Sequence, residues 1–272
     1  MSGKSNFNCE NPTERKGILV ASFGTSHGDT RKAAIEECEN RITESFPEHE
    51  VYRAFTSNIV RKVLKERDGE SVDDVSEALI KMRDEKFTEV IVQPLHIIPG
   101  EEYQEKIIKV AESFRCSFKR IAVGRPLLND IDDYRIAAEA LKNQLNELKE
   151  DHSVVLMGHG SHHPANACYS CFQMIINDEI PNVFIGTVEG YPELGDIIPK
   201  LKSKNIKRVS LMPYMLVAGD HAKNDMAGEE EDSWKRILEK EGFEVDVCLK
   251  GLGENPAYQN IFVNHARDAM EG

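Results

Sequence analysis

Three side chains of the kinds that bind divalent metal ions follow short apolar runs in the second half of this 272-residue sequence. His159 follows the run 154–157, Glu189 follows a run that begins at Val183, and His221 lies a few residues after a third run. Two imidazoles and one carboxylate suit a first-row metal such as cobalt, nickel, iron or zinc, and they leave coordination positions open for a reactant. The residue types therefore predict a reactive metal site, provided that the fold brings the three together.

The surroundings of His159 indicate where such a site would lie. Short apolar runs next to glycine are typical of buried parallel strands, and 154–157 is followed by Gly158-His159-Gly160. Glycine lets the backbone turn sharply and approach a ligand closely, and Pro164 suits the first turn of a following helix. We therefore predict that His159 lies in a strand-to-helix turn at the carboxyl end of a strand, where open α/β sheets bind ligands. A lone histidine there is more often a hydrogen-bonded turn residue, and its two partners favour the metal site.

Strand and helix signals alternate along the chain. In the first half, strands are predicted at 17–23, 51–55, 89–95 and 119–123, and a helix over 131–148 closes the half. Such alternation predicts parallel sheets with right-handed crossovers. In the doubly wound order two-one-three, the ends of the first three strands are neighbours about 4.8 Å apart. In the second half, this order would let the three metal-binding side chains converge.

The second half repeats the first in the same order. The matching segments are ILVASFGTS with VVLMGHGSH, VYRAFTSNI with VFIGTVEGY, VIVQPLHIIPGEEY with VSLMPYMLVAGDHA, and IAVGRPLLND with VCLKGLGENP. Four matches in one order indicate a duplicated α/β unit. His159 aligns with Phe23 and His221 aligns with Glu102, so the first half lacks the histidine pair.

The repeat predicts an α/β fold of two similar doubly wound parallel-sheet domains that face a central cleft. We expect an N-terminal extension over 1–15, a first domain over 16–129 and a second domain over 130–272 that carries the metal site. A helix over 256–270 closes the second half, and the alternative is that it packs back onto the first domain.

The composition excludes several classes of partner. The net charge of −13 argues against nucleic acid and anionic membranes. The first residues have no apolar core of a signal peptide, and the apolar run 18–23 is too short to span a bilayer. Six cysteines in a chain this long do not indicate a disulfide framework, so we expect a cytoplasmic protein. Whether it forms a homo-oligomer is left open.

Several motifs together resemble the anaerobic cobalt chelatases of cobalamin biosynthesis (the CbiK type), which are related to ferrochelatases in the class II chelatase group. The resemblance covers residues 16–272 and rests on ASFGTS, YRAFTS, LHIIPGEEY, MGHGSHH, VEGYPE, MLVAGDHAKNDM and GLGENPA. It implies insertion of Co²⁺, as substrate metal, into sirohydrochlorin or precorrin-2 without ATP and without an organic cofactor. It also implies metal ligands at His159, Glu189 and His221, with catalytic roles for the first two.

Candidate substrate-binding residues lie at other strand ends and helix starts. Apolar side chains would line a slot for the macrocycle: Phe23, Leu95, Ile97, Tyr214, Met215 and Leu216. Backbone N–H groups at Gly24-Thr25-Ser26 and at Gly160-Ser161 suit anions. Arg53, Arg125 and Lys223 are candidates for pairing with the substrate's carboxylates. His96 and Glu102 follow the third strand and are expected to face the cleft.

Three further points stay open at this level. Cys168 and Cys171 form a C-x-x-C that we interpret as structural, and the roles of His162 and His163 are undetermined. A chelatase for another pairing, such as Fe²⁺ or Ni²⁺ with sirohydrochlorin or iron with protoporphyrin, is one alternative, because this ligand set does not select cobalt. A non-catalytic tetrapyrrole or metal carrier is the other, although a carrier needs no proton acceptor.

Overall fold

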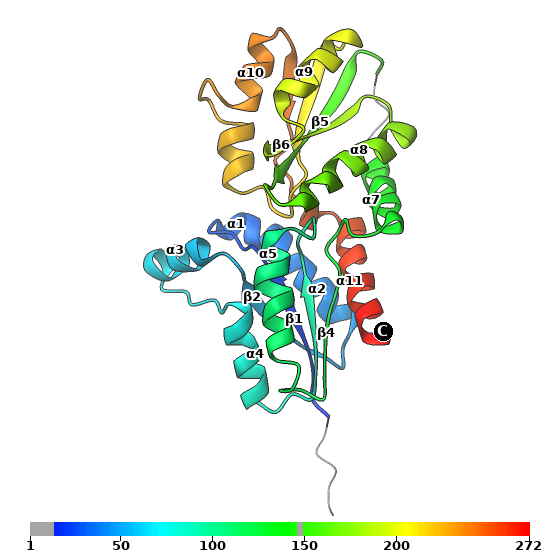
Figure 1. The fold of residues 1–272 in the computed structure, drawn as a ribbon. Coiled ribbons are helices and arrows are strands. Elements are labelled where there is room, and N and C mark those ends of the chain that lie inside the picture. Colours follow the sequence, from blue (N-terminus) through cyan, green and yellow to red (C-terminus); the bar gives the residue numbers. More distant parts are fainter. Residues whose placement is uncertain (1–13, 146–148) are drawn as a thin grey trace, which may run out of the picture.

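Each half of the chain folds around a four-stranded parallel sheet, which confirms the doubly wound α/β architecture predicted from the alternating signals (Figure 1). The computed structural model describes residues 14–145 and 149–272, so most of the expected N-terminal extension and the end of the helix expected over 131–148 lie outside it. The strands of the first sheet are β1 Lys16–Ser22, β2 Glu50–Phe55, β3 Glu89–Pro94 and β4 Arg120–Val123. Those of the second are β5 His152–Gly160, β6 Val183–Glu189, β7 Arg208–Pro213 and β8 Glu244–Val247.

Helices connect the strands and cover both faces of each sheet. In the first half they are α1 Gly28–Thr30, η1 Arg31–Glu36, α2 Glu37–Ser45, α3 Asn58–Asp68, α4 Val75–Asp84, α5 Glu101–Tyr103, η2 Gln104–Ile108, α6 Lys109–Ser113 and α7 Ile131–Gln144. In the second they are η3 Pro164–Asn166, α8 Ala167–Glu179, α9 Leu194–Ser203, η4 Ala222–Met226, α10 Trp234–Lys240, η5 Leu252–Glu254 and α11 Pro256–Glu271. The segments η1, η2 and η4 are π-helical, and η3 and η5 are 3₁₀ turns.

The two sheets share one strand order, β2-β1-β3-β4 and β6-β5-β7-β8, and all their pairings are parallel. The order places the first strand of each half in the middle, so the loops after the first three strands meet at one sheet edge. Among the residues that the structure describes, no helix is both long and apolar enough to cross a membrane.

The helix α11 connects the two halves. It packs against α2, β3 and β4 of the first half and against α7, which in turn packs on α8. One apolar core therefore runs from Ile18 of the first sheet through Phe262 of α11 to Leu156 of the second sheet. The outer face of each sheet has a core of its own. This continuous core stabilises the relative position of the two halves.

A buried charge network fixes α11 to the first half. The Asp133 carboxylate on α7 accepts hydrogen bonds from His265 Nε2 at 2.8 Å and from Arg125 at 3.2 Å, and Arg125 also pairs with Asp268 at 2.9 Å. Burial alone would raise the pKa of Asp133, but the hydrogen bonds from His265 and Arg125 outweigh it and lower the pKa from 3.8 to about 2. The carboxylate is therefore held in its charged form in the folded protein.

We predict that Asp133→Asn lowers the free energy of unfolding by about 3 kcal/mol at neutral pH, because it leaves the buried partners without their carboxylate. Because the pKa is lowered on folding, the stabilisation is present above the ordinary value of 3.8 and is lost as pH falls towards about 2. Urea denaturation at several pH values measures both effects.

The matched control is Asp132→Asn on the same helix. The Asp132 side chain is 79% exposed and pairs with Arg135 at 3.4 Å. Its replacement should change the free energy of unfolding by no more than about 0.5 kcal/mol. Equal effects of the two substitutions, or a wild-type advantage over Asp133→Asn that does not shrink in acid, would contradict the prediction.

Candidate active site

The ladder between β5 and β6 positions the first two predicted metal ligands. Its last pair joins Gly160 to Glu189, so β5 continues past the apolar run to the end of the pairing with β6. His159 is therefore the second-last residue of a strand, and the prediction that it lies in the following turn was wrong. The reason is that the glycines allow the strand to stay paired, instead of ending it at Gly158.

Only glycine fits at position 160. Its φ of +84° lies in the left-handed region, and a Cβ there would come within 2.0 Å of the Glu189 carbonyl oxygen. The absence of a side chain thus lets the two strand ends approach each other, with Gly160 opposite Glu189 and His159 one residue before that pair. Gly24, the counterpart in the first half, has a φ of +89°.

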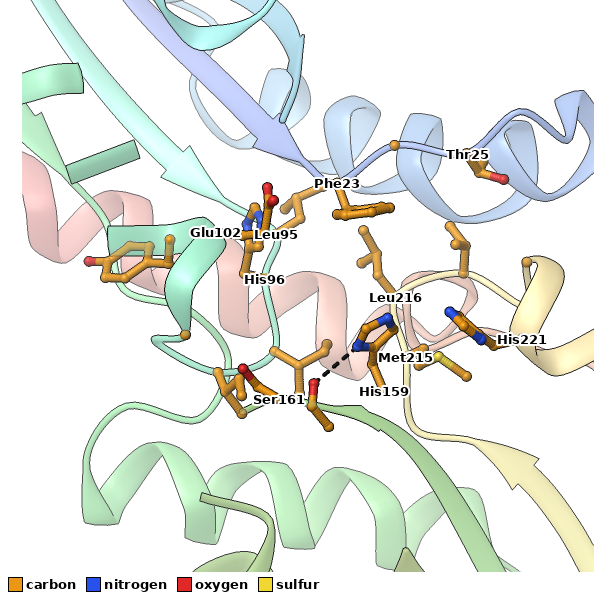
Figure 2. A pocket seen from close by; sticks show the side chains of 18 of the residues that line it. Phe23, Thr25, Leu95, His96, Glu102, His159, Ser161, Met215, Leu216 and His221 are labelled. Carbon is orange, nitrogen blue, oxygen red and sulfur yellow. Dashed lines mark hydrogen bonds between the residues drawn. The ribbon is translucent and has the colours of Figure 1, made fainter. Parts of the chain in front are cut away.

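The two predicted metal-binding histidines come together. The ring centroids of His159 and His221 are 4.8 Å apart, and the rings meet edge to face at 83° (Figure 2). His159 Nδ1 donates to the Gly160 carbonyl oxygen at 3.0 Å, and His221 Nδ1 donates to the Asp225 carboxylate. Both bonds place the proton on Nδ1, so the lone pair on Nε2 of each ring is available to a metal.

Asp225 was missed by the sequence analysis. It orients His221 as a carboxylate partner commonly orients a metal-binding histidine. The two are four residues apart around the start of the π-helical turn η4, where side chains at this spacing share a face. The signal was present in the motif HAKND, as an acid four residues after a predicted ligand.

Glu189 lies at the same cavity but is exposed. Among the described residues, no three His, Cys, Asp or Glu side chains already stand in an arrangement that could hold a metal ion. The histidine pair is thus in place, whereas coordination by His159, Glu189 and His221 together remains a prediction.

A cavity of about 460 Å³ extends from the histidine pair between the two halves. Nearly all the residues predicted to bind substrate line it: Phe23, Gly24, Thr25, Ser26, His96, Glu102 and Gly160. Apolar side chains from both halves complete the lining, among them Leu95, Ile97, Met215 and Leu216. No lysine or arginine of the described residues lines it, so the interior suits an apolar, flat ring better than anionic groups.

The basic residues predicted to contact the substrate lie outside the cavity. Arg53 does not line the cavity, because its guanidinium makes a bidentate pair with Glu39 on the neighbouring helix α2. Arg125 belongs to the Asp133 network, and Lys223 lies 3.5 Å from Asp29. All three basic side chains thus pair with carboxylates of this chain and do not line the cavity, so contacts between them and the substrate's carboxylates stay a prediction.

Tyr214 is also not part of the slot. It is completely buried, and its ring stacks on Phe172 at a centroid distance of 4.8 Å. The helices α8 and α11 cover this residue, with Phe172 of α8 and Tyr258 of α11 next to it. It is therefore a core residue.

Two ionisable residues of the first half, His96 and Glu102, line this cavity. Both ring nitrogens of His96 and the Oε2 atom of Glu102 have almost no accessible surface and no hydrogen bond to any residue that the structure describes. Burial lowers the pKa of His96 to about 4, so its imidazole is neutral at physiological pH.

The C-x-x-C motif lies on α8, and no disulfide joins Cys168 to Cys171. Burial raises the pKa of the Cys168 thiol, which is opposite to the shift that a reactive thiolate needs. His163 Nδ1 accepts a hydrogen bond from Ala165 N at 3.2 Å, so it caps the turn before α8.

Comparisons with known proteins found similar sequences and a similar fold. A family model described as cobalt chelatase (CbiK) matches residues 16–271. The chain is 41% identical over 256 residues to a sirohydrochlorin cobaltochelatase of Salmonella typhimurium, covering 94% of this chain and 97% of that protein. It is 38% identical over 261 residues to sirohydrochlorin cobaltochelatase CbiKC of Nitratidesulfovibrio vulgaris, covering 95% and 92%. The sirohydrochlorin chelatase SirB of Bacillus subtilis subspecies spizizenii, solved with cobalt, shares the fold with a TM-score of 0.64, 15% identity and coverage of 94% and 96%.

The geometry of β5 yields a prediction for Gly160→Ala. The added methyl group would be strained at this φ and would collide with the Glu189 carbonyl oxygen. We expect the free energy of unfolding to fall by about 2 kcal/mol. Because the strand end must move, the dissociation constant for Co²⁺ should rise at least about tenfold.

Gly195→Ala is the control, because a Cβ at this position in α9 meets nothing within 4 Å. It should leave Co²⁺ binding unchanged and stabilise the helix by up to about 1 kcal/mol. Calorimetric Co²⁺ titrations and thermal unfolding test both variants. A Gly160→Ala protein with wild-type stability and affinity would refute the role given to this glycine.

Proposed function

The chain belongs to the cobalt chelatase (CbiK) family, and from this membership we propose that it is a lyase that inserts Co²⁺ into sirohydrochlorin or precorrin-2 without ATP. The observation that supports this proposal most directly is the pair His159 and His221. Their Nε2 atoms are left available beside an apolar cavity lined by both halves. Metal and macrocycle would meet there, and cobalt is a substrate of the reaction.

In the proposed reaction, His159, Glu189 and His221 hold a partly dehydrated Co²⁺. Neutral imidazoles are good ligands for this ion near pH 7, because the lone pair on Nε2 needs no deprotonation. The Glu189 carboxylate offsets part of the metal's charge. A site with three protein ligands leaves positions at which the ring nitrogens can replace water.

The cavity would hold the macrocycle as a flat apolar ring. Phe23 is half-exposed in this cavity, and Leu216 lines it from the second half (Figure 2). No lysine or arginine of the described residues lines the cavity, so the carboxylates of sirohydrochlorin would lie towards solvent or meet backbone N–H groups. The loop at Gly24-Thr25-Ser26, which precedes the helix that begins with α1, offers such groups.

The test is an anaerobic absorbance assay of the purified protein with sirohydrochlorin and, in turn, Co²⁺, Fe²⁺ and Ni²⁺. Repeated turnover with Co²⁺ is the expected result. Binding of the macrocycle without turnover would indicate a carrier, and faster turnover with Fe²⁺ or Ni²⁺ would indicate a chelatase of different metal preference. The cytoplasmic location and the oligomeric state remain predictions.

We predict that His159→Ala removes nearly all insertion activity and leaves the protein folded. Loss of a ligand in direct contact with the metal should lower kcat by about 10³-fold or more. The control is His152→Ala, at the other end of the same strand, where the ring contacts Ser210 Oγ at 2.9 Å. The control should retain kcat within about threefold, and wild-type turnover by His159→Ala would exclude it as a ligand.

We also predict that Glu189→Gln weakens metal use more than macrocycle binding. Glutamine keeps the size of the side chain and removes the charge that offsets Co²⁺, so the apparent Co²⁺ constant should rise by about tenfold or more. A fluorescence titration with sirohydrochlorin should be nearly unchanged. If only the tetrapyrrole affinity fell, Glu189 would be a substrate contact and not a metal ligand.

A further inference from the structure

His96 has a fixed backbone and free ring nitrogens. It follows the end of β3, and its carbonyl oxygen accepts a hydrogen bond from Leu127 N at 2.9 Å. The ring lines the cavity from the first half, whereas His159 and His221 come from the second (Figure 2). The residue is partly exposed, but neither ring nitrogen contacts solvent or any hydrogen-bond partner among the described residues.

Burying ring nitrogens without hydrogen bonds lowers the stability of a folded protein. A buried polar atom without a hydrogen bond destabilises a protein by about 1–3 kcal/mol, so most are paired. Both unpartnered groups belong to residues that line one wall of one cavity, and a change of side-chain rotamer would bring their free atoms to an occupant that supplies the missing partners. That occupant must offer hydrogen-bond donors, because Glu102 accepts when it is ionised.

The internal repeat shows that this wall is not a copy of the metal-binding wall. Met215 stands at the position equivalent to His96, and His221 stands at that of Glu102. Both Glu102 and His221 lie just before a π-helical turn, η2 and η4 respectively. The first half therefore has a carboxylate where the second half has the imidazole of His221. It has the imidazole of His96 where the second half has the apolar Met215.

We propose that His96 is a catalytic residue that accepts a pyrrole proton from the macrocycle, while the metal is delivered from the histidine pair of the second half. The proposal rests on the chelatase function proposed above. The central N–H groups of a metal-free tetrapyrrole are the donors that the unpartnered atoms of this wall require.

The protons and electrons of the step balance. Two pyrrole N–H bonds break, their electron pairs stay on the nitrogens, and the nitrogens use these pairs to bind Co²⁺. One proton moves to a ring nitrogen of His96 and the other to the Glu102 carboxylate. Both protons pass to water after the product leaves. No oxidant, reductant or nucleotide is needed.

The environment of His96 suits a transient acceptor. Its lowered pKa keeps the imidazole unprotonated before the macrocycle binds, and a proton gained from the ring is readily released. Coordination of the ring to Co²⁺ makes the remaining N–H groups more acidic, as a metal does for other bound donors. A weakly basic imidazole is therefore sufficient.

The first test is His96→Gln. Glutamine can hydrogen-bond to the ring but cannot take a proton near neutral pH. We expect kcat for Co²⁺ insertion to fall by about 10²–10⁴-fold, while the dissociation constants for sirohydrochlorin and for Co²⁺ change by less than about threefold. A kcat within about threefold of wild type, or a loss confined to substrate binding, would overturn the proposal.

His49→Gln is the matched control. His49 also has a buried, unpartnered ring nitrogen, and burial also lowers its pKa, but it precedes β2 at the sheet end remote from the cavity. Its kcat should equal that of wild type. Absence of turnover in wild type and control alike would refute the chelatase function, whereas turnover in all three proteins would refute only the role of His96.

His96→Ala provides a second measurement if the glutamine variant does not fold. The truncation leaves a space in which added imidazole can replace the lost ring. We expect imidazole to restore insertion in a concentration-dependent way, and substituted imidazoles to restore it in the order of their basicity. A folded His96→Ala protein that binds sirohydrochlorin but shows no rescue would contradict proton transfer at this position.

Discussion

The end of the β5–β6 ladder is the constraint on which the site depends. Parallel pairing continues to Gly160 and Glu189, and a residue with a side chain at position 160 would push the strands apart. The pairing places His159 and Glu189 at the carboxyl edge of the sheet, and the neighbouring strand β7 leads into the loop that carries His221. The fold thus brings His159 and His221 together, and the hydrogen bonds to Gly160 and Asp225 determine which nitrogen each ring presents.

The internal repeat gives each half a sheet whose strands end at the cavity, and the two halves differ in the side chains at these carboxyl ends. At the position of His159 the first half has Phe23, which offers an apolar surface to a ring. At the position of His221 it has Glu102, whose buried Oε2 atom has no hydrogen-bond partner in the described part of the chain. In the proposed reaction, one wall of the cavity would hold the cation while the other would offer acceptors for protons. Metal insertion needs both on a single substrate, and a symmetric pair of walls would supply only one.

Sequence patterns were sufficient for the strands, their order and the histidine pair, because apolar runs and glycines act locally and the doubly wound order follows from alternation. Sequence patterns were insufficient where contacts between distant segments determine the surroundings of a side chain. Arg53 was assigned to substrate because it ends near a strand terminus, but α2 packs beside β2 and supplies Glu39 to it. Tyr214 was assigned to the slot, but α8 and α11 bury it, and the packing of α11 on the first sheet involves residues more than a hundred positions apart.

The contacts on the two sides of the cavity differ in strength, and this difference follows from burial. On one side, α11 joins the halves through a continuous apolar core and the Asp133–His265 pair, whose side chains are 3% and 2% exposed. On the other side, the halves meet through His27 and Asp220 at 2.8 Å, and the Asp220 side chain is 71% exposed. Breaking a buried pair costs several kcal/mol, whereas an exposed pair contributes at most about 1 kcal/mol. The separation of the two walls is therefore maintained mainly from the α11 side, and the weaker contact lies next to His221, where the metal ligands are.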